Sequence, residues 1–183
     1  MIITIFEEHN NKSLYPINQV RASCEFRCGG FTNLERIQNS LDINDEIQLF
    51  VRNEIKDIIQ DRHPNISVNP DSLLPGIWLN GQAIWTKEDI QKITSGRTFT
   101  YQGHLLALHN RETIPISDVG SYMSKSSLVS TEMDIAFINN IWDLISIQPE
   151  MIIADAPHFM NSQAGKIHPS VVLENGDNIY IGK

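Results

Sequence analysis

Arginines and glycines with the types and spacing to bind phosphate stand near the start of the chain, in the stretch LYPINQVRASCEFRCGGFTNLER. Arg21 and Arg27 precede Gly29, and a predicted helix follows. Arginines beside a loop that a ligand can approach closely suit phosphate recognition in a strand-loop-helix setting. The structural alternative, turn glycines with solvated charges, carries equal weight. Arg21 and Arg27 are our candidates for phosphate contacts.

A second candidate lies in the segment IWLNGQAIW, residues 77–85. The apolar start of this segment predicts a strand. Asn80 and Gly81 then have the left-handed propensity that suits a tight turn at its carboxyl end. Ligands of doubly wound sheets bind at that edge. Asn80 and Gly81 are therefore candidates for the rim of a substrate pocket, and a plain turn is about as well supported.

Alternating strands and helices are expected to position these residues. The apolar patterns predict strands over residues 2–6, 45–51, 65–68, 77–80, 97–101 and 104–109, and helices over 32–41, 53–62 and 86–94. Thr32 and Glu35 have the spacing of a capping box, which gives Glu35 a structural role. The alternation favours a three-layer α/β domain with a mostly parallel sheet.

Three further segments complete the expected domain. Residues 110–130 are polar and rich in serine, which indicates a flexible surface loop. Residues 131–146 have the apolar spacing of a helix or a helix-turn, and they contain the pair Trp142-Asp143. Pro149 is expected in the first turn of a helix that runs to about Ala156.

Composition excludes several classes of function. The chain has 183 residues and a net charge of −8, which argues against a nucleic-acid-binding surface because such a surface needs a basic face. No apolar run reaches the length of a membrane span, and the amino terminus reads as a strand rather than a signal peptide. Cys24 and Cys28 have no partners at zinc-finger spacing, so free thiols in a reducing cytoplasm are favoured over a metal site.

The carboxyl-terminal segment has a period of its own. Ile167, Leu173 and Ile179 are six residues apart, the period of the hexapeptide repeat of a left-handed parallel β-helix. One turn of such a helix cannot bury its own core. We therefore expect a main domain over residues 1–162 and the first turn of a truncated β-helix over residues 163–183. A coincidental pair of strands is the alternative.

The arginine stretch resembles the opening of a known family. Its pattern, L-x-P-x-x-x-x-R-x-x-x-E-x-R-x-G-x-x-T-x-x-E, is similar to that of bacterial sugar nucleotidyltransferase-like proteins related to the bifunctional enzyme that makes UDP-N-acetylglucosamine. The matching positions are Leu14, Pro16, Arg21, Glu25, Arg27, Gly29, Thr32 and Glu35. The resemblance implies a Rossmann-like nucleotidyltransferase domain, followed by a β-helical acyltransferase domain that usually forms homotrimers.

The resemblance also implies a reaction and its ligands. A nucleoside triphosphate, most plausibly UTP, would join a sugar 1-phosphate, most plausibly N-acetylglucosamine 1-phosphate, with release of pyrophosphate. Gly29 and Gly103 would then contact substrate. Asp143 would bind Mg²⁺ or the sugar, although helix capping or pairing with an arginine explains it equally well.

Three departures from the family pattern bear on catalysis. Ala22 replaces the proline that usually follows the first arginine, and the glycine-rich loop of the large pyrophosphorylase families is absent. Gln82 stands where such enzymes place a magnesium-binding aspartate, and a neutral amide is a poor ligand for that ion. These differences keep a second hypothesis open, in which the domain binds sugar nucleotides without catalysis or serves as a scaffold for a downstream β-helix.

Overall fold

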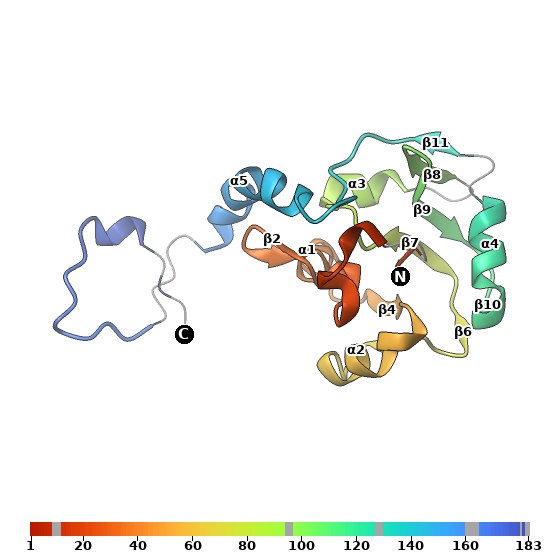
Figure 1. Ribbon diagram of the computed structural model, residues 1–183, viewed down its shortest axis with the longest axis horizontal. Helices are drawn as coiled ribbons and strands as arrows, with labels where there is room; N and C mark the ends of the chain where they lie inside the picture. Colours follow the sequence, from red (N-terminus) through yellow and green to blue (C-terminus); the bar gives the residue numbers. More distant parts are fainter. Residues whose placement is uncertain (9–11, 94–96, 127–129, 160–164, 180, 182–183) are drawn as a thin grey trace.

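The computed structural model describes residues 1–8, 12–93, 97–126, 130–159, 165–179 and 181. A seven-stranded sheet forms its centre, with the order β11-β8-β9-β7-β1-β4-β5 (Figure 1). The strands are β1 (Ile2–Phe6), β4 (Glu46–Phe50), β5 (Ser67–Val68), β7 (Gly76–Asn80), β8 (Thr98–Tyr101), β9 (His104–Asn110) and β11 (Thr131–Glu132). Within this sheet only β9 runs antiparallel to its neighbours. The predicted α/β fold with a mostly parallel sheet is confirmed.

Short helices, one β-hairpin and one further pair of antiparallel strands surround the sheet. The α-helices are α1 (Asn33–Ser40), α2 (Lys56–Arg62), α3 (Lys87–Lys92), α4 (Val119–Ser126) and α5 (Asp143–Asp155). The additional strands are β2 (Arg27–Cys28) with β3 (Phe31–Thr32), and β6 (Ser72–Leu73) with β10 (Ile114–Pro115). Short 3-10 helices include η1 (Lys12–Leu14), η2 (Ile17–Gln19) and η3 (Ser23–Glu25). The predicted capping box begins α1, with Glu35 N–H donating to Thr32 Oγ1 at 3.1 Å.

Side chains of β1 point to opposite faces of the sheet, and helices pack on both faces, which gives three layers. Ile3 and Ile5 point to one face, where the core includes residues of α1, α2 and α3. Phe6 points to the other face and packs in a core with Trp78 and with Val119 of α4. Figure 1 shows α4 on the opposite side of the sheet from α1. Burial of both faces explains why the central strands are almost continuously apolar.

The prediction of a flexible loop over residues 110–130 was wrong. This segment forms β10, a 3-10 helix over Ile116–Asp118, and α4, with residues 127–129 outside the described residues. Val119 is fully buried, and the Tyr122 ring lies 5.7 Å from the Trp78 ring. Apolar packing on the outer face of the sheet therefore stabilises a helix that its serine-rich sequence does not favour.

The predicted helical boundaries after residue 130 were also wrong. Residues 131–132 form an edge strand, and helix begins only at Asp143. Helix α5 runs to Asp155 and contains Pro149 in its interior rather than in its first turn. Its inner residues Leu144, Ile147 and Met151 pack on a small core with Phe26 and Cys28. This burial offsets the backbone hydrogen bond that proline cannot donate.

The carboxyl-terminal segment lies beyond the end of α5, away from the sheet (Figure 1). Its described residues 165–179 and 181 contain a 3-10 helix over Gly176–Asn178 and no strand. Val171 and Val172 are exposed. The β-helix and the division at residue 162 therefore stay predictions. No helix within the described ranges is long and apolar enough to cross a membrane.

Close approach of β7 to β1 gives a test of the sheet register. A Cβ atom on Gly76 would lie 2.1 Å from the Ile2 carbonyl oxygen, which belongs to rigid backbone. We expect Gly76→Ala to lower the free energy of unfolding by about 3 kcal/mol, measured by urea denaturation. Gly120→Ala is the matched control, because no atom lies within 4 Å of its added Cβ and alanine favours helix α4. Equal stability of the two variants would contradict this register.

Candidate functional site

The strand order changes direction at the centre of the sheet. From β1 the chain passes to β4 on one side, whereas β7 lies on the other side of β1 and continues toward β9. The carboxyl ends of β1 and β7, at Phe6 and Asn80, therefore flank a topological switch point. Open α/β sheets bind ligands outside such an edge. This edge is the candidate site.

A buried carboxylate attaches the arginine-bearing segment to this edge. Glu7, directly after β1, accepts hydrogen bonds from Ser23 N–H at 2.8 Å and from the Arg52 guanidinium at 3.0 Å. Arg52 also donates to the carbonyl oxygen of Arg21 at 3.4 Å. Burial raises the pKa of Glu7, and the charge of Arg52 partly opposes that rise. The segment from η2 to η3 is thus held over the ends of β1 and β4.

Glu25 makes a second attachment. It is buried and accepts a hydrogen bond from Ala22 N–H at 3.0 Å. Its other contacts are Arg62 Nη1 at 3.0 Å and His63 Nε2 at 3.1 Å, both at the carboxyl end of α2. The glutamate of the sequence pattern therefore fixes η3 against α2. This contact positions Arg21 and engages both oxygens of the Glu25 carboxylate.

The structure brings Arg21 and Arg27 together in one surface hollow of about 660 Å³. Thr32 and Leu144 are among the residues that line it. The Arg21 side chain forms no hydrogen bond or ion pair with the described residues. Arg27 donates to Glu35 Oε2 at 3.1 Å and to the carbonyl oxygen of Gly30. Arg21 is therefore the available cation of the pair, and Arg27 is held by its neighbours.

Asn80 and Gly81 lie at the switch point but beneath its surface. The Asn80 amide is fully buried, donates to the Leu105 carbonyl oxygen at 2.8 Å and accepts from Gln82 N–H at 2.9 Å. A Cβ atom on Gly81 would lie 2.8 Å from Ser23 Oγ. These two residues form the floor on which η3 rests, so their proposed contact with substrate stays a prediction.

Gly29 and Asp143 lie apart from the switch point, whereas Gly103 lies in the turn directly before β9, at the carboxyl edge of the sheet. Gly29 N–H donates to Gln148 Oε1 of α5 at 3.0 Å, and Gly103 has φ +86° in the exposed turn between β8 and β9. Asp143 Oδ2 accepts from Asn139 N–H at 2.9 Å and from Asn140 N–H at 2.7 Å, which holds the turn that precedes α5. The geometry gives each of the three a structural role.

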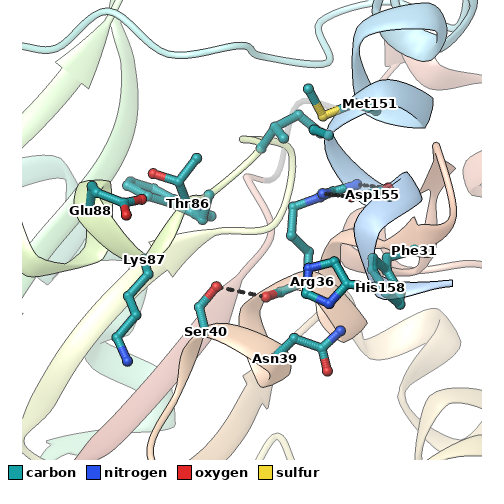
Figure 2. Close-up of a pocket in the computed structure, with 13 residues that line it drawn as sticks. Phe31, Arg36, Asn39, Ser40, Thr86, Lys87, Glu88, Met151, Asp155 and His158 are labelled. Carbon is teal, nitrogen blue, oxygen red and sulfur yellow. Dashed lines mark hydrogen bonds and ion pairs between the residues drawn. The ribbon is translucent and has the colours of Figure 1, made fainter. Parts of the chain in front are cut away.

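A second hollow, of about 370 Å³, lies between α1, α3 and α5. Figure 2 shows Arg36 reaching Asp155 on one wall, with Lys87 across the hollow. Arg36 binds both Asp155 carboxylate oxygens, at 2.5 and 2.8 Å, and Gly30 N–H donates to the same carboxylate at 2.8 Å. Burial acts to raise the pKa of Asp155, but the bonds from Arg36 and Gly30 outweigh it and lower that pKa. This ion pair attaches α5 to α1.

Asp143, the residue predicted to bind magnesium, is not part of a cluster of metal ligands among the described residues. They contain no group of three histidine, cysteine, aspartate or glutamate side chains that could hold a metal. Asp143 accepts hydrogen bonds from the turn before α5, and Gln82 is buried with its amide nitrogen donating to the Ile138 carbonyl oxygen at 2.8 Å. Magnesium prefers carboxylate oxygens, so these two positions supply no adequate ligand set.

Sequence reasoning missed one pair of residues at the switch point. Glu8 follows β1, and its Oε2 lies 2.6 Å from Nδ1 of His104, the first residue of β9. A glutamate two residues after a predicted central strand was the available signal. The pairing itself depends on the sheet order, which brings β1 and β9 to either side of β7.

An α/β domain with cations over a central switch point belongs to the class of nucleotide-binding folds. Residues 3–163 match a family model described as sugar nucleotidyl transferase. The chain therefore belongs to the sugar nucleotidyl transferase family.

Comparison with solved structures finds a weak likeness. A Bacillus anthracis protein assigned as a glucose-1-phosphate thymidylyltransferase, crystallised with sucrose, superposes with a TM-score of 0.44 at 11% identity. The match covers 82% of this chain and 94% of that chain. No curated protein matches the sequence.

The Arg36–Asp155 pair predicts acid-sensitive stability. Asp155 has a lowered folded pKa, so its stabilisation is present above its unfolded pKa and disappears as pH falls through the folded value. At pH 7 we expect Asp155→Asn to cost about 3 kcal/mol, because Arg36 loses its buried partner. The difference from wild type, measured by urea denaturation, should shrink below about pH 4.

Asp118→Asn is the control for this experiment, because Asp118 is exposed on the far side of the sheet. The free energy of unfolding of this variant should equal that of the wild type at every pH. An Asp155→Asn variant whose deficit is the same at pH 3 and pH 7 would contradict the ionic attachment of α5.

Proposed function

We propose that this domain transfers a nucleotidyl group from a nucleoside triphosphate to a sugar 1-phosphate, with UTP and N-acetylglucosamine 1-phosphate as the first substrates to test. Family membership supports the reaction class. The observation that carries the site assignment is Arg21, whose guanidinium has no partner among the described residues while its backbone is fixed over the switch point by Arg52. A positioned, unpaired arginine is suited to phosphate binding.

In the proposed reaction a phosphate oxygen of the sugar 1-phosphate attacks the α-phosphorus of the nucleoside triphosphate in line. The new bond joins that oxygen to the α-phosphorus, the bond between the α-phosphorus and its bridging oxygen to the β-phosphorus breaks, and pyrophosphate leaves. No covalent enzyme nucleophile is needed, so the protein contributes positioning and charge neutralisation. Arg21 neutralises phosphate charge, and Arg27 borders the same hollow.

A non-catalytic domain is the second candidate. The absence of an acidic metal cluster from the described residues, together with the buried amide of Gln82, favours it. In this alternative, residues 1–162 bind a sugar nucleotide or support a β-helical acyltransferase that begins at residues 163–183 and forms a homotrimer. The location in either case would be cytoplasmic.

Pyrophosphate release distinguishes the two candidates. The assay combines UTP or dTTP with glucose 1-phosphate, glucosamine 1-phosphate or N-acetylglucosamine 1-phosphate, with and without Mg²⁺. Turnover of one pair would establish the reaction and its specificity. Binding of a sugar nucleotide without pyrophosphate release would support the non-catalytic candidate.

Arg21→Ala tests the phosphate site directly. We expect at least a tenfold loss of UTP affinity by isothermal titration calorimetry, because a charge-assisted hydrogen bond contributes about 1.5–3 kcal/mol. Stability should not change, since the Arg21 side chain contacts none of the described residues through a polar bond.

The matched control removes the same charge from the opposite edge of the sheet. Arg97 is exposed and precedes β8, which runs parallel to β7, so it lies at the amino edge. Arg97→Ala should bind UTP like the wild type. Retained affinity in Arg21→Ala would remove Arg21 from the site.

A further inference from the structure

We propose that Glu8 and His104 form a binding pair for a carbohydrate hydroxyl group, with His104 Nε2 as the contacting atom and Glu8 as the residue that positions it. The proposal rests on the proposed function, because it assigns a substrate group to the same edge of the sheet. The ligand class is a sugar ring, which either the sugar 1-phosphate or the ribose of the nucleotide can supply.

Glu8 is fixed through both of its carboxylate oxygens. Oε1 accepts the backbone N–H of Leu105 at 2.9 Å, and Oε2 lies 2.6 Å from His104 Nδ1. An ionised carboxylate only accepts hydrogen bonds, so the proton between Glu8 and His104 belongs to Nδ1. Nε2 is therefore the ring nitrogen left for a hydrogen bond with a ligand.

The orientation of the His104 ring is fixed by a further contact. The ring stacks on Phe137 with centroids 4.9 Å apart and an interplanar angle of 28°. Phe137 is buried, and its backbone forms an isolated antiparallel β-bridge with Ala83, which follows shortly after β7. Because the carboxylate holds one edge of the imidazole and the aromatic ring holds one face, the direction of Nε2 is determined before a ligand arrives.

His104 Nε2 is accessible at the switch point. The His104 side chain is 33% exposed, and Nε2 has no partner among the described residues. The neighbouring Leu105 carbonyl oxygen accepts from Asn80, the last residue of β7. The pair therefore lies over the carboxyl ends of β1 and β7, where a ligand of this fold binds.

Charge favours a hydroxyl over a phosphate at this position. The Glu8 carboxylate is next to the imidazole, and its negative charge repels a second anion. A hydroxyl group is neutral and can either donate a hydrogen bond to Nε2 or accept one from it. Arg21, by contrast, is a cation whose side chain has no polar partner among the described residues, and it suits the phosphates. The substrate would thus meet a cationic contact and a hydroxyl contact at two different points of one edge.

The first experiment compares wild type, Glu8→Gln and His104→Phe by isothermal titration calorimetry. The phenylalanine keeps the aromatic stacking on Phe137 but removes Nε2. The titrants are UTP, N-acetylglucosamine 1-phosphate and inorganic pyrophosphate. We expect His104→Phe to bind one of the two sugar-containing ligands about five- to tenfold more weakly, the loss expected for one hydrogen bond, with pyrophosphate affinity unchanged. Glu8→Gln should weaken binding of the same ligand.

The ligand that loses affinity identifies the source of the hydroxyl group. Weaker binding of UTP alone assigns it to the ribose, and weaker binding of the sugar 1-phosphate alone assigns it to the sugar. His158→Phe is the control, because this exposed histidine lies at the end of α5, away from the switch point. Unchanged affinities in both variants, or an equal loss of pyrophosphate binding, would overturn the proposal.

Nitrogen-15 NMR of the histidines in the wild-type protein provides a readout that does not depend on the variants folding. The ligand identified by calorimetry should shift the His104 Nε2 resonance, while the resonances of His158 stay unchanged. A pair that is only structural would leave the resonance in place. If wild-type protein binds neither UTP nor a sugar 1-phosphate, the proposed function fails, whereas wild-type binding with unchanged variants rejects only the role of His104.

Discussion

The buried carboxylate of Glu7 is the interaction on which the candidate site depends. A carboxylate at 3% exposure is costly unless it is paired, and Glu7 obtains its partners from two distant parts of the chain, Ser23 N–H and Arg52. Those partners lie on the segment over the edge and on the loop after β4. Satisfying the Glu7 charge therefore also fixes where Arg21 lies. Glu25 repeats this arrangement with Arg62, so two buried glutamates hold a segment that contains little regular structure.

The elements that could be predicted from the sequence are those whose stabilising features are visible in the local sequence. Strands β1, β4 and β7 were predicted because their apolar runs are buried on both faces, and α1 because its capping box is local. Helix α4 was not predicted, since its stability comes from Val119 and Tyr122 packing against Trp78, a contact far away in the sequence. Sequence patterns reflect interactions between residues that are close in the chain, whereas tertiary packing stabilises this helix.

The candidate site could likewise be predicted only in part. The arginine stretch was identified from residue types, and the structure brings Arg21 and Arg27 to one hollow. The sequence could not show that Arg27 is paired with Glu35, that Asn80 is buried, or that Gly29 packs on α5. Each of these depends on which side chain satisfies which polar group. Spacing alone does not determine that partner.

His104 shows how the topology creates a site that neither segment contains alone. On its own strand it is one polar residue beside a turn, and Glu8 is one acid after another strand. The insertion of β7 between β1 and β9 brings the two within 2.6 Å, and Phe137 arrives from a third segment to fix the ring. A partly exposed side-chain pair contributes little to stability, so three segments that converge on one partly exposed imidazole are poorly explained by stability. Orientation of Nε2 toward the switch point is the consequence that such an arrangement does provide.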